Sequence, residues 1–174
     1  MMKFNPIERN TILRLLFLTL LLLLAPLAKA QRSITVSGST WNVAPEPIVE
    51  AGGDYLGSYQ SAPDQVLLNV RVPLLLASGR VSVRYEPNPN WHVDLNLSAR
   101  RTGDGSTLCL LCAISGGTAY QQVTSVDTEL FIIQAVLALA SYSNIPVQLR
   151  LSGVSVTLPT GNYQARVVFT IGPT

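Results

Sequence analysis

The sequence has few of the residues that carry most enzyme chemistry. Its 174 residues include one histidine, His92, and two cysteines, and no G-x-S-x-G, H-E-x-x-H or phosphate-loop motif occurs. A catalytic nucleophile needs a histidine and an orienting acid beside it, and a zinc site commonly takes several histidines or cysteines. We therefore predict that the protein is not an enzyme and that it takes no cofactor and no metal ion.

Lysine is absent after Lys29, and charge of either sign is sparse. The chain has 12 basic and 10 acidic residues, and its first 30 residues hold four of the basic residues and one of the acidic ones. The remainder therefore has 8 arginines against 9 acids, a net charge of 8 − 9 = −1. Nucleic-acid binding wants a concentrated basic surface. We expect no nucleic acid as a partner.

The start of the chain has the features of an export signal. A basic region is followed by the apolar run Leu15 to Ala25 and then by the small residues of Ala28-Lys29-Ala30. These features predict a secretory signal peptide at residues 1–30, cleaved after Ala30. The apolar run is shorter than the roughly 20 residues that span a bilayer, although an uncleaved N-terminal anchor is an alternative. We expect a secreted or cell-surface protein with no stable membrane span after cleavage.

Residues 31–174 are expected to form a single domain made of short strands. Apolar and polar residues alternate with a period of two, and Pro, Gly, Asn and Asp occur between the alternating runs. This pattern predicts an all-β fold, an antiparallel immunoglobulin-like β-sandwich of about seven to nine strands. The expected strands cover residues 34–43, 66–72, 81–85, 91–97, 147–151, 154–158 and 163–171.

Two segments do not fit this alternation. Residues 129–143 are apolar and rich in alanine, and we expect a strand over 130–133 followed by an irregular or short helical connection. A segment this apolar could alternatively face a partner subunit. Ser152-Gly153 interrupts two apolar runs whose phase changes there, which predicts a bulge or a crossing between sheets.

Cys109 and Cys112 form a C-x-x-C motif in a chain that we expect to be exported. An oxidising compartment favours a disulfide, and the first and last residues of a four-residue turn lie within about 7 Å. We predict a Cys109–Cys112 disulfide. Free or intermolecular thiols, and a redox or metal role, are the alternatives.

Several aromatic residues could instead belong to a ligand site. Trp41, Tyr55, Tyr59, Trp91 and Tyr120 could form a stacking platform for sugars, but aromatic side chains more commonly fill a core. The loop around Asp104 could alternatively hold calcium, although it has fewer acids than an EF-hand loop. His92 shares a strand pattern with Asp94, which predicts an exposed polar face.

The end of the chain resembles the last strand of bacterial surface subunits. In LPTGNYQARVVFTI, Pro159, Gly161 and Tyr163 follow the P-x-G-x-Y pattern found before the final strand of chaperone–usher pilins and spore-coat U-like proteins. Central segments of the chain resemble those of uncharacterised exported bacterial proteins. Alternation places one set of side chains of the last strand toward the core: Tyr163, Ala165, Val167, Phe169 and Ile171.

The resemblance implies a mode of assembly. In those families the terminal strand is paired inside a sheet, and an exposed edge beside it accepts a strand from another chain. The N-terminal segment with Ile34 and Val36 is the candidate donor strand. The alternative is that both termini are ordinary strands of a monomer.

We therefore predict a non-catalytic extracytoplasmic structural or surface protein, pilin-like, fimbrial or coat-like, that assembles by strand addition. Its expected partner is a second copy or another surface subunit. The alternative is a secreted module that binds carbohydrate or another surface ligand.

Overall fold

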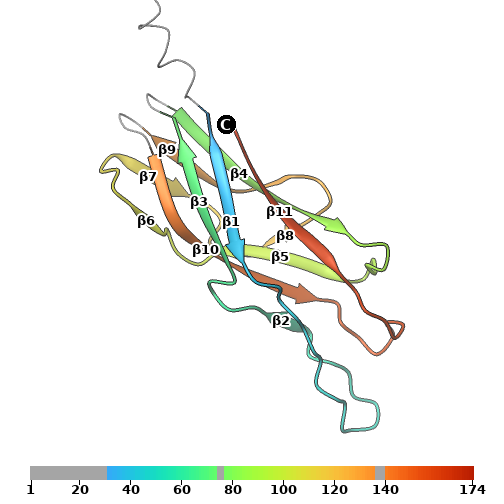
Figure 1. Cartoon of the computed structure of the whole chain (residues 1–174). Coiled ribbons are helices and arrows are strands. Elements are labelled where there is room, and N and C mark those ends of the chain that lie inside the picture. Colours follow the sequence, from blue (N-terminus) through green and yellow to red (C-terminus); the bar gives the residue numbers. More distant parts are fainter. Residues whose placement is uncertain (1–30, 74–76, 136–139) are drawn as a thin grey trace, which may run out of the picture. The chain divides into compact units, whose positions relative to one another are not determined.

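The computed structural model describes residues 31–73, 77–135 and 140–174 (Figure 1). The chain divides into two units, Met1–Gln31 and Arg32–Thr174. The expected signal peptide, residues 1–30, lies outside the described residues. These residues form eleven strands in two antiparallel sheets. They contain no helix, and hence none long and apolar enough to cross a membrane. The predicted all-β sandwich is confirmed.

The larger sheet has seven strands, and its longest strand, β10, pairs with four others. The main order is β1-β3-β10-β5-β8, while β2 and β6 also pair with β10. All these pairings are antiparallel. The strands are β1 (Ser33–Gly38), β2 (Ser58–Gln60), β3 (Val66–Val72), β5 (Asn96–Arg101), β6 (Ser106–Thr107), β8 (Gln121–Val123) and β10 (Ala140–Ser152).

The smaller sheet has four strands in the order β11-β4-β9-β7. They are β4 (Ala77–Pro87), β7 (Cys112–Ser115), β9 (Thr128–Ala135) and β11 (Ala165–Gly172). The described residues thus hold eleven strands where about seven to nine were predicted, and three of the eleven, β2, β6 and β8, have only two or three residues. The first and last described strands, β1 and β11, are edge strands of different sheets and lie side by side (Figure 1).

The core lies between the two sheets, as the alternation predicts. Along β3 the buried positions recur at every second residue from Val66 to Val72. In the other sheet, Val81 and Val83 of β4 are fully buried. Burying a side chain of this size stabilises the fold by about 1.5–3 kcal/mol relative to exposing it. The two sheets therefore hold each other through their alternating apolar faces.

Two predicted strands are turns instead. In the run predicted as strand 91–97, β5 begins only at Asn96, and the preceding Val93 is 85% exposed. The backbone N–H of Trp91 donates to the carbonyl of Asn88, which closes a turn within the Pro- and Asn-rich segment. In the run predicted as strand 154–158, the N–H of Leu158 donates to the carbonyl of Ser155.

The alanine-rich segment is strand on both sides of residues 136–139, which lie outside the described residues. β9 continues to Ala135 and β10 begins at Ala140, so the described residues hold no helical connection there. At Ser152-Gly153 a bulge or a crossing between sheets was expected: β10 ends at Ser152, and the next strand, β11, belongs to the other sheet. Register shifts lie elsewhere, between Tyr142 and Ile145 and between Val81 and Ser82. Gly153 has a φ of 87° and directly follows the end of β10.

Candidate functional site

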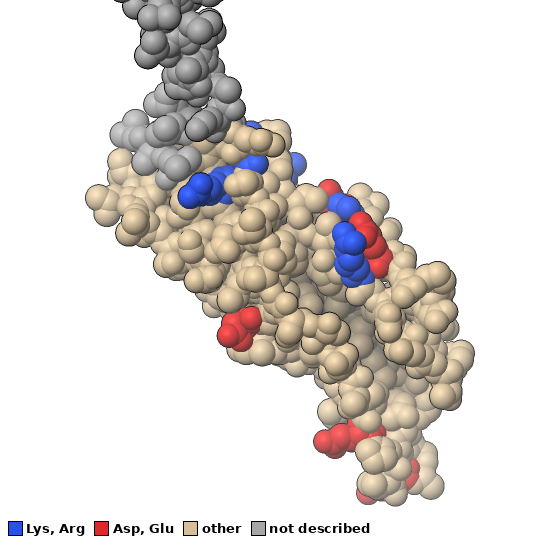
Figure 2. Space-filling view, viewed as in Figure 1, with Lys and Arg blue, Asp and Glu red and all other residues tan. Residues whose placement is uncertain are grey.

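The two terminal strands leave hydrogen-bonding edges without partners among the described residues. β1 pairs only with β3, and β11 pairs only with β4. Natural edge strands are commonly protected by charged residues or proline. β1 (SITVSG) has neither, and β11 has a single charge, Arg166. In the view of Figure 2 most of the surface is uncharged. Both edges therefore have the properties of strands that accept another strand.

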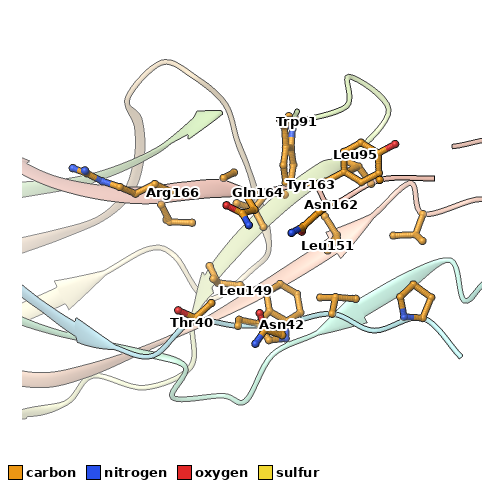
Figure 3. A pocket seen from close by; sticks show the side chains of 18 of the residues that line it. Thr40, Asn42, Trp91, Leu95, Leu149, Leu151, Asn162, Tyr163, Gln164 and Arg166 are labelled. Carbon is orange, nitrogen blue, oxygen red and sulfur yellow. The ribbon is translucent and has the colours of Figure 1, made fainter. Parts of the chain in front are cut away.

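A groove of about 930 Å³ lies between these two edges (Figure 3). Its apolar floor comes from both sheets and includes Leu149 and Leu151 of β10 and Phe169 of β11. In Figure 3, Thr40 lies on one side of these leucines and Gln164 on the other. The groove therefore combines a floor of core side chains with a polar rim.

The local sequence explains why the groove opens where it does. β1 ends at Gly38, whose Cα lies so close to the carbonyl of Gln65 that a Cβ would clash with it. Beyond Gly38 the chain runs without sheet pairing. On the opposite side, the hydroxyl of Tyr163 donates to the carbonyl of Pro159 and closes the turn that precedes β11. Both edges thus leave their sheets at the same end, and the space between them is the groove.

Aromatic side chains form part of the groove wall. Trp41, Tyr55 and Trp91 line it together with Tyr163. The ring of Trp91 packs against Tyr85, with the ring centroids 5.7 Å apart. Because Trp41 and Trp91 are the only two tryptophans of the chain, intrinsic tryptophan fluorescence reports on this groove. Sequence reasoning missed the polar part of the lining, which includes the amides of Asn42, Asn162 and Gln164.

The candidate donor residues lie in a strand that is paired within its own chain. In β1, Ile34 is half-buried against the core, while Val36 is 50% exposed and lines the groove. The antiparallel register places Ile34 opposite Val70 and Val36 opposite Leu68. Whether β1 is also donated to another chain remains a prediction.

The final strand contributes to the core from an edge position. Phe169 is buried, Val167 and Ile171 pack against the core, and Ala165 is half-buried. Tyr163 precedes β11 and lines the groove instead. The placement of this strand inside a sheet, which the resemblance implied, is wrong, because β11 is the edge of the four-stranded sheet.

Cys109 and Cys112 form a disulfide with their Cα atoms 5.5 Å apart. It closes the loop between β6 and β7 at a point where three leucines face solvent. Leu108, Leu110 and Leu111 are 100%, 98% and 56% exposed. The disulfide thus fixes the shape of an apolar loop.

The candidate metal ligands lie apart from one another. No group of three His, Cys, Asp or Glu side chains that could hold a metal ion occurs among the described residues. Asp104 pairs with the buried guanidinium of Arg101, whose pKa is lowered by burial. His92 lies in a turn, where its Nδ1 accepts a hydrogen bond from the N–H of Asp94 at 3.3 Å. The expected strand face with His92 and Asp94 is therefore wrong.

The remaining aromatics are separated from the groove wall. Tyr59 is half-buried on β2, and its hydroxyl makes no hydrogen bond within the described residues. Tyr120 directly precedes β8 and packs against two arginines. Of the five predicted aromatics, the structure therefore places three in the groove wall and leaves Tyr59 and Tyr120 outside it.

Comparison with known proteins gives no match to this chain. No family model matches it, and neither does any curated protein or solved structure.

Proposed function

We propose that this protein is a non-catalytic, extracytoplasmic structural or surface protein that self-associates by strand addition. One observation carries the proposal: both terminal strands have edges without a pairing partner among the described residues, and both edges border a single groove with an apolar floor. A strand entering the groove would make backbone hydrogen bonds to an edge, and every second side chain would reach the floor.

The strand that we propose to be donated is β1 of a second copy. Only one of its six residues is even half-buried, so its release uncovers little apolar surface. Ile34 and Val36 share one face of β1 and would lie on Leu149 and Phe169 of the acceptor. Donation from one copy to the next is a heterologous contact, which generates chains of subunits rather than closed dimers.

The connection after β1 is long enough for such an exchange. Residues 39–57 separate Gly38 from Ser58, which gives 58 − 38 − 1 = 19 residues without strand structure. Fully extended, 19 residues span about 60 Å. β1 can therefore reach a neighbouring copy while β2 and the rest of the sandwich remain in place.

A charge placed on the donor strand tests the proposal. Val36→Lys puts a cation where the added strand would meet the apolar floor, so we expect it to abolish self-association measured by light scattering and sedimentation. Val49→Lys is the matched control, because Val49 is 92% exposed and lies outside both β1 and the groove lining. Self-association of Val36→Lys at the wild-type level, or a wild-type protein that stays monomeric at high concentration, would contradict the proposal.

A second candidate function is carbohydrate binding in the same groove. The aromatic wall and the amides of Asn42, Asn162 and Gln164 favour it, because rings stack on sugars and amides both donate to and accept from hydroxyls. Titration with neutral oligosaccharides, followed by tryptophan fluorescence, distinguishes the two functions. A saturable change that is lost in Gln164→Ala favours sugar binding, whereas a change that depends only on protein concentration favours strand addition.

A further inference from the structure

A second cluster of side chains lies on the outer face of the seven-stranded sheet. Alternation along β10 directs Val147 and Leu149 to the core, and Gln148 and Arg150 to the opposite face. Arg100 of β5 shares that outer face, because it lies opposite Gln148 in the register. This cluster is therefore separated from the groove by the thickness of the sheet.

The cluster centres on one aromatic ring. The guanidinium carbon of Arg100 lies 4.6 Å from the centroid of the Tyr120 ring, and that of Arg150 lies 4.1 Å from it. Both of these guanidinium-to-ring distances are within the range of cation–π attraction. The Tyr120 hydroxyl also donates a hydrogen bond to Oε1 of Gln60 at 3.2 Å. We call Arg100, Tyr120 and Arg150 the arginine platform.

Side chains beneath the platform hold it in place. Nε of Arg100 donates to Oε1 of Gln148 at 3.0 Å, and Nε2 of Gln148 donates to the carbonyl of Ser61 at 2.8 Å. Gln148 is only 6% exposed, so this network lies beneath the surface. The orientation of the Arg100 guanidinium is therefore set before any ligand arrives.

The charge of the platform is not compensated within the described residues. Four arginines in this part of the chain pair with carboxylates, and they are Arg80, Arg84, Arg101 and Arg166. Neither Arg100 nor Arg150 forms an ion pair there. Nε of Arg150 is also buried without a hydrogen-bond partner within the described residues, although buried polar groups nearly always have one. Two like charges held on one ring favour a ligand that brings negative charge.

Amide side chains extend the platform along the same face. Nε2 of Gln122 on β8 donates to Oδ1 of Asn96 on β5 at 3.1 Å, and both residues are exposed. Gln60 adds a third exposed amide. Amides donate and accept at once, as sugar hydroxyls do. Large exposed apolar side chains, which would give a peptide its anchors, are absent from these positions.

We propose that the arginine platform binds an acidic polysaccharide through the carboxylates of its uronic acid residues. Arginine presents parallel N–H donors that match both oxygens of a carboxylate. The flanking amides then bind the hydroxyls of neighbouring sugars. This site is independent of strand addition in the groove, since its residues lie on the opposite face of the sheet.

Calorimetric titration of the full exported chain with an oligogalacturonide tests the proposal. We expect saturable binding that weakens as salt is raised, and no binding of the methyl-esterified oligomer, which has lost its carboxylates. Replacing both arginines, Arg100→Gln with Arg150→Gln, should weaken binding by at least about tenfold for each arginine. Arg80→Gln, which removes the same charge from β4 of the other sheet and lies outside the groove lining, should bind like the wild type.

A second variant guards against loss of folding in the glutamine variant. Replacing both arginines by lysine keeps the charge and loses the paired donors, so we expect affinity between that of the wild type and the glutamine variant, with an unchanged thermal melt. Unaltered binding by the glutamine variant would overturn the proposal. Equal binding of oligoglutamate would overturn the assignment to a saccharide, and tighter binding of a sulfated neutral backbone would overturn the assignment to carboxylates.

Discussion

Removing the Phe169 ring tests the register of the last strand. Phe169 is 7% exposed and lies opposite the fully buried Val83 of β4. Loss of on the order of 100 Å² of apolar burial, at about 25 cal/mol per Å², removes about 2.5 kcal/mol. The space left by the ring adds to this loss, and substitutions of this kind cost about 3–5 kcal/mol. Because Phe169 borders the open groove, water can fill part of that space. We therefore expect Phe169→Ala to cost about 3 kcal/mol.

Urea unfolding gives the measurement. With a slope of about 2 kcal/mol per M of urea, a loss of 3 kcal/mol lowers the midpoint by about 1.5 M. Arg166→Ala on the same strand is the control. Its side chain is 76% exposed and its carboxylate partner Glu86 is 3.5 Å away, so its removal should cost no more than about 0.5–1 kcal/mol.

Thr170→Ala should fall between these two variants. Its hydroxyl donates to Asp127 at 3.2 Å, and a lost hydrogen bond costs about 1 kcal/mol. A one-residue slip of β11 would exchange its two faces. Equal midpoints for Phe169→Ala and Arg166→Ala, or a larger loss for Arg166→Ala, would refute the register and the contribution of β11 to the core.

Three further predictions concern processing, the disulfide and a pH-dependent turn. Intact-mass measurement of exported protein should give an N-terminus at Gln31, whereas a membrane-retained species with residues 1–30 would refute cleavage. Replacing Cys109 and Cys112 together by serine should cost no more than about 2 kcal/mol in a thermal melt, since the closed loop is short. The N–H of Val156 donates to the carboxylate of Asp54, and this hydrogen bond lowers the pKa of that carboxyl. The stabilisation by the ionised carboxylate is therefore present above the unfolded pKa and is lost as pH falls through the folded pKa. The protection of the Val156 N–H, which is its exchange rate relative to the intrinsic rate at the same pH, should therefore fall at acid pH in the wild type and be low at all pH values in Asp54→Ala, which has no acceptor at this position.

The core strands were predictable because their alternation has a single physical cause. In β3 and β4, side chains two residues apart point to the same face, and that face packs against the other sheet. The alternation of burial along these strands can therefore be predicted directly from the alternation of apolar and polar residues. The same reasoning failed at residues 154–158, where the alternating run is a turn. That turn is held by Asp54, which is 102 residues from Val156 in the sequence. A local pattern contains no information about such a distant partner.

The functional surfaces were less predictable because they depend on the order of strands. The aromatic residues of the groove were identified from the sequence as a set, but nothing in their spacing separates Trp41 from Tyr120. The arginine platform forms only because β10, β5 and β8 are neighbours in that order. Arg100 and Arg150 are therefore scattered charges in the sequence and a paired site in the fold.

Because the two proposed sites lie on different surfaces, strand addition at one leaves the other open to a ligand. Strand addition occupies the groove between β1 and β11, whereas the arginine platform lies on the outer face of the larger sheet. Assembly would therefore leave every platform exposed and repeat it along the chain of subunits. Because linked sites raise the apparent affinity for a polymer by about 10²–10⁴-fold, the assembled protein should bind a long polyuronate far more tightly than Val36→Lys does. A short oligomer that spans one platform should bind both proteins equally. A difference confined to the long polymer separates repetition of the site from any change in the site itself.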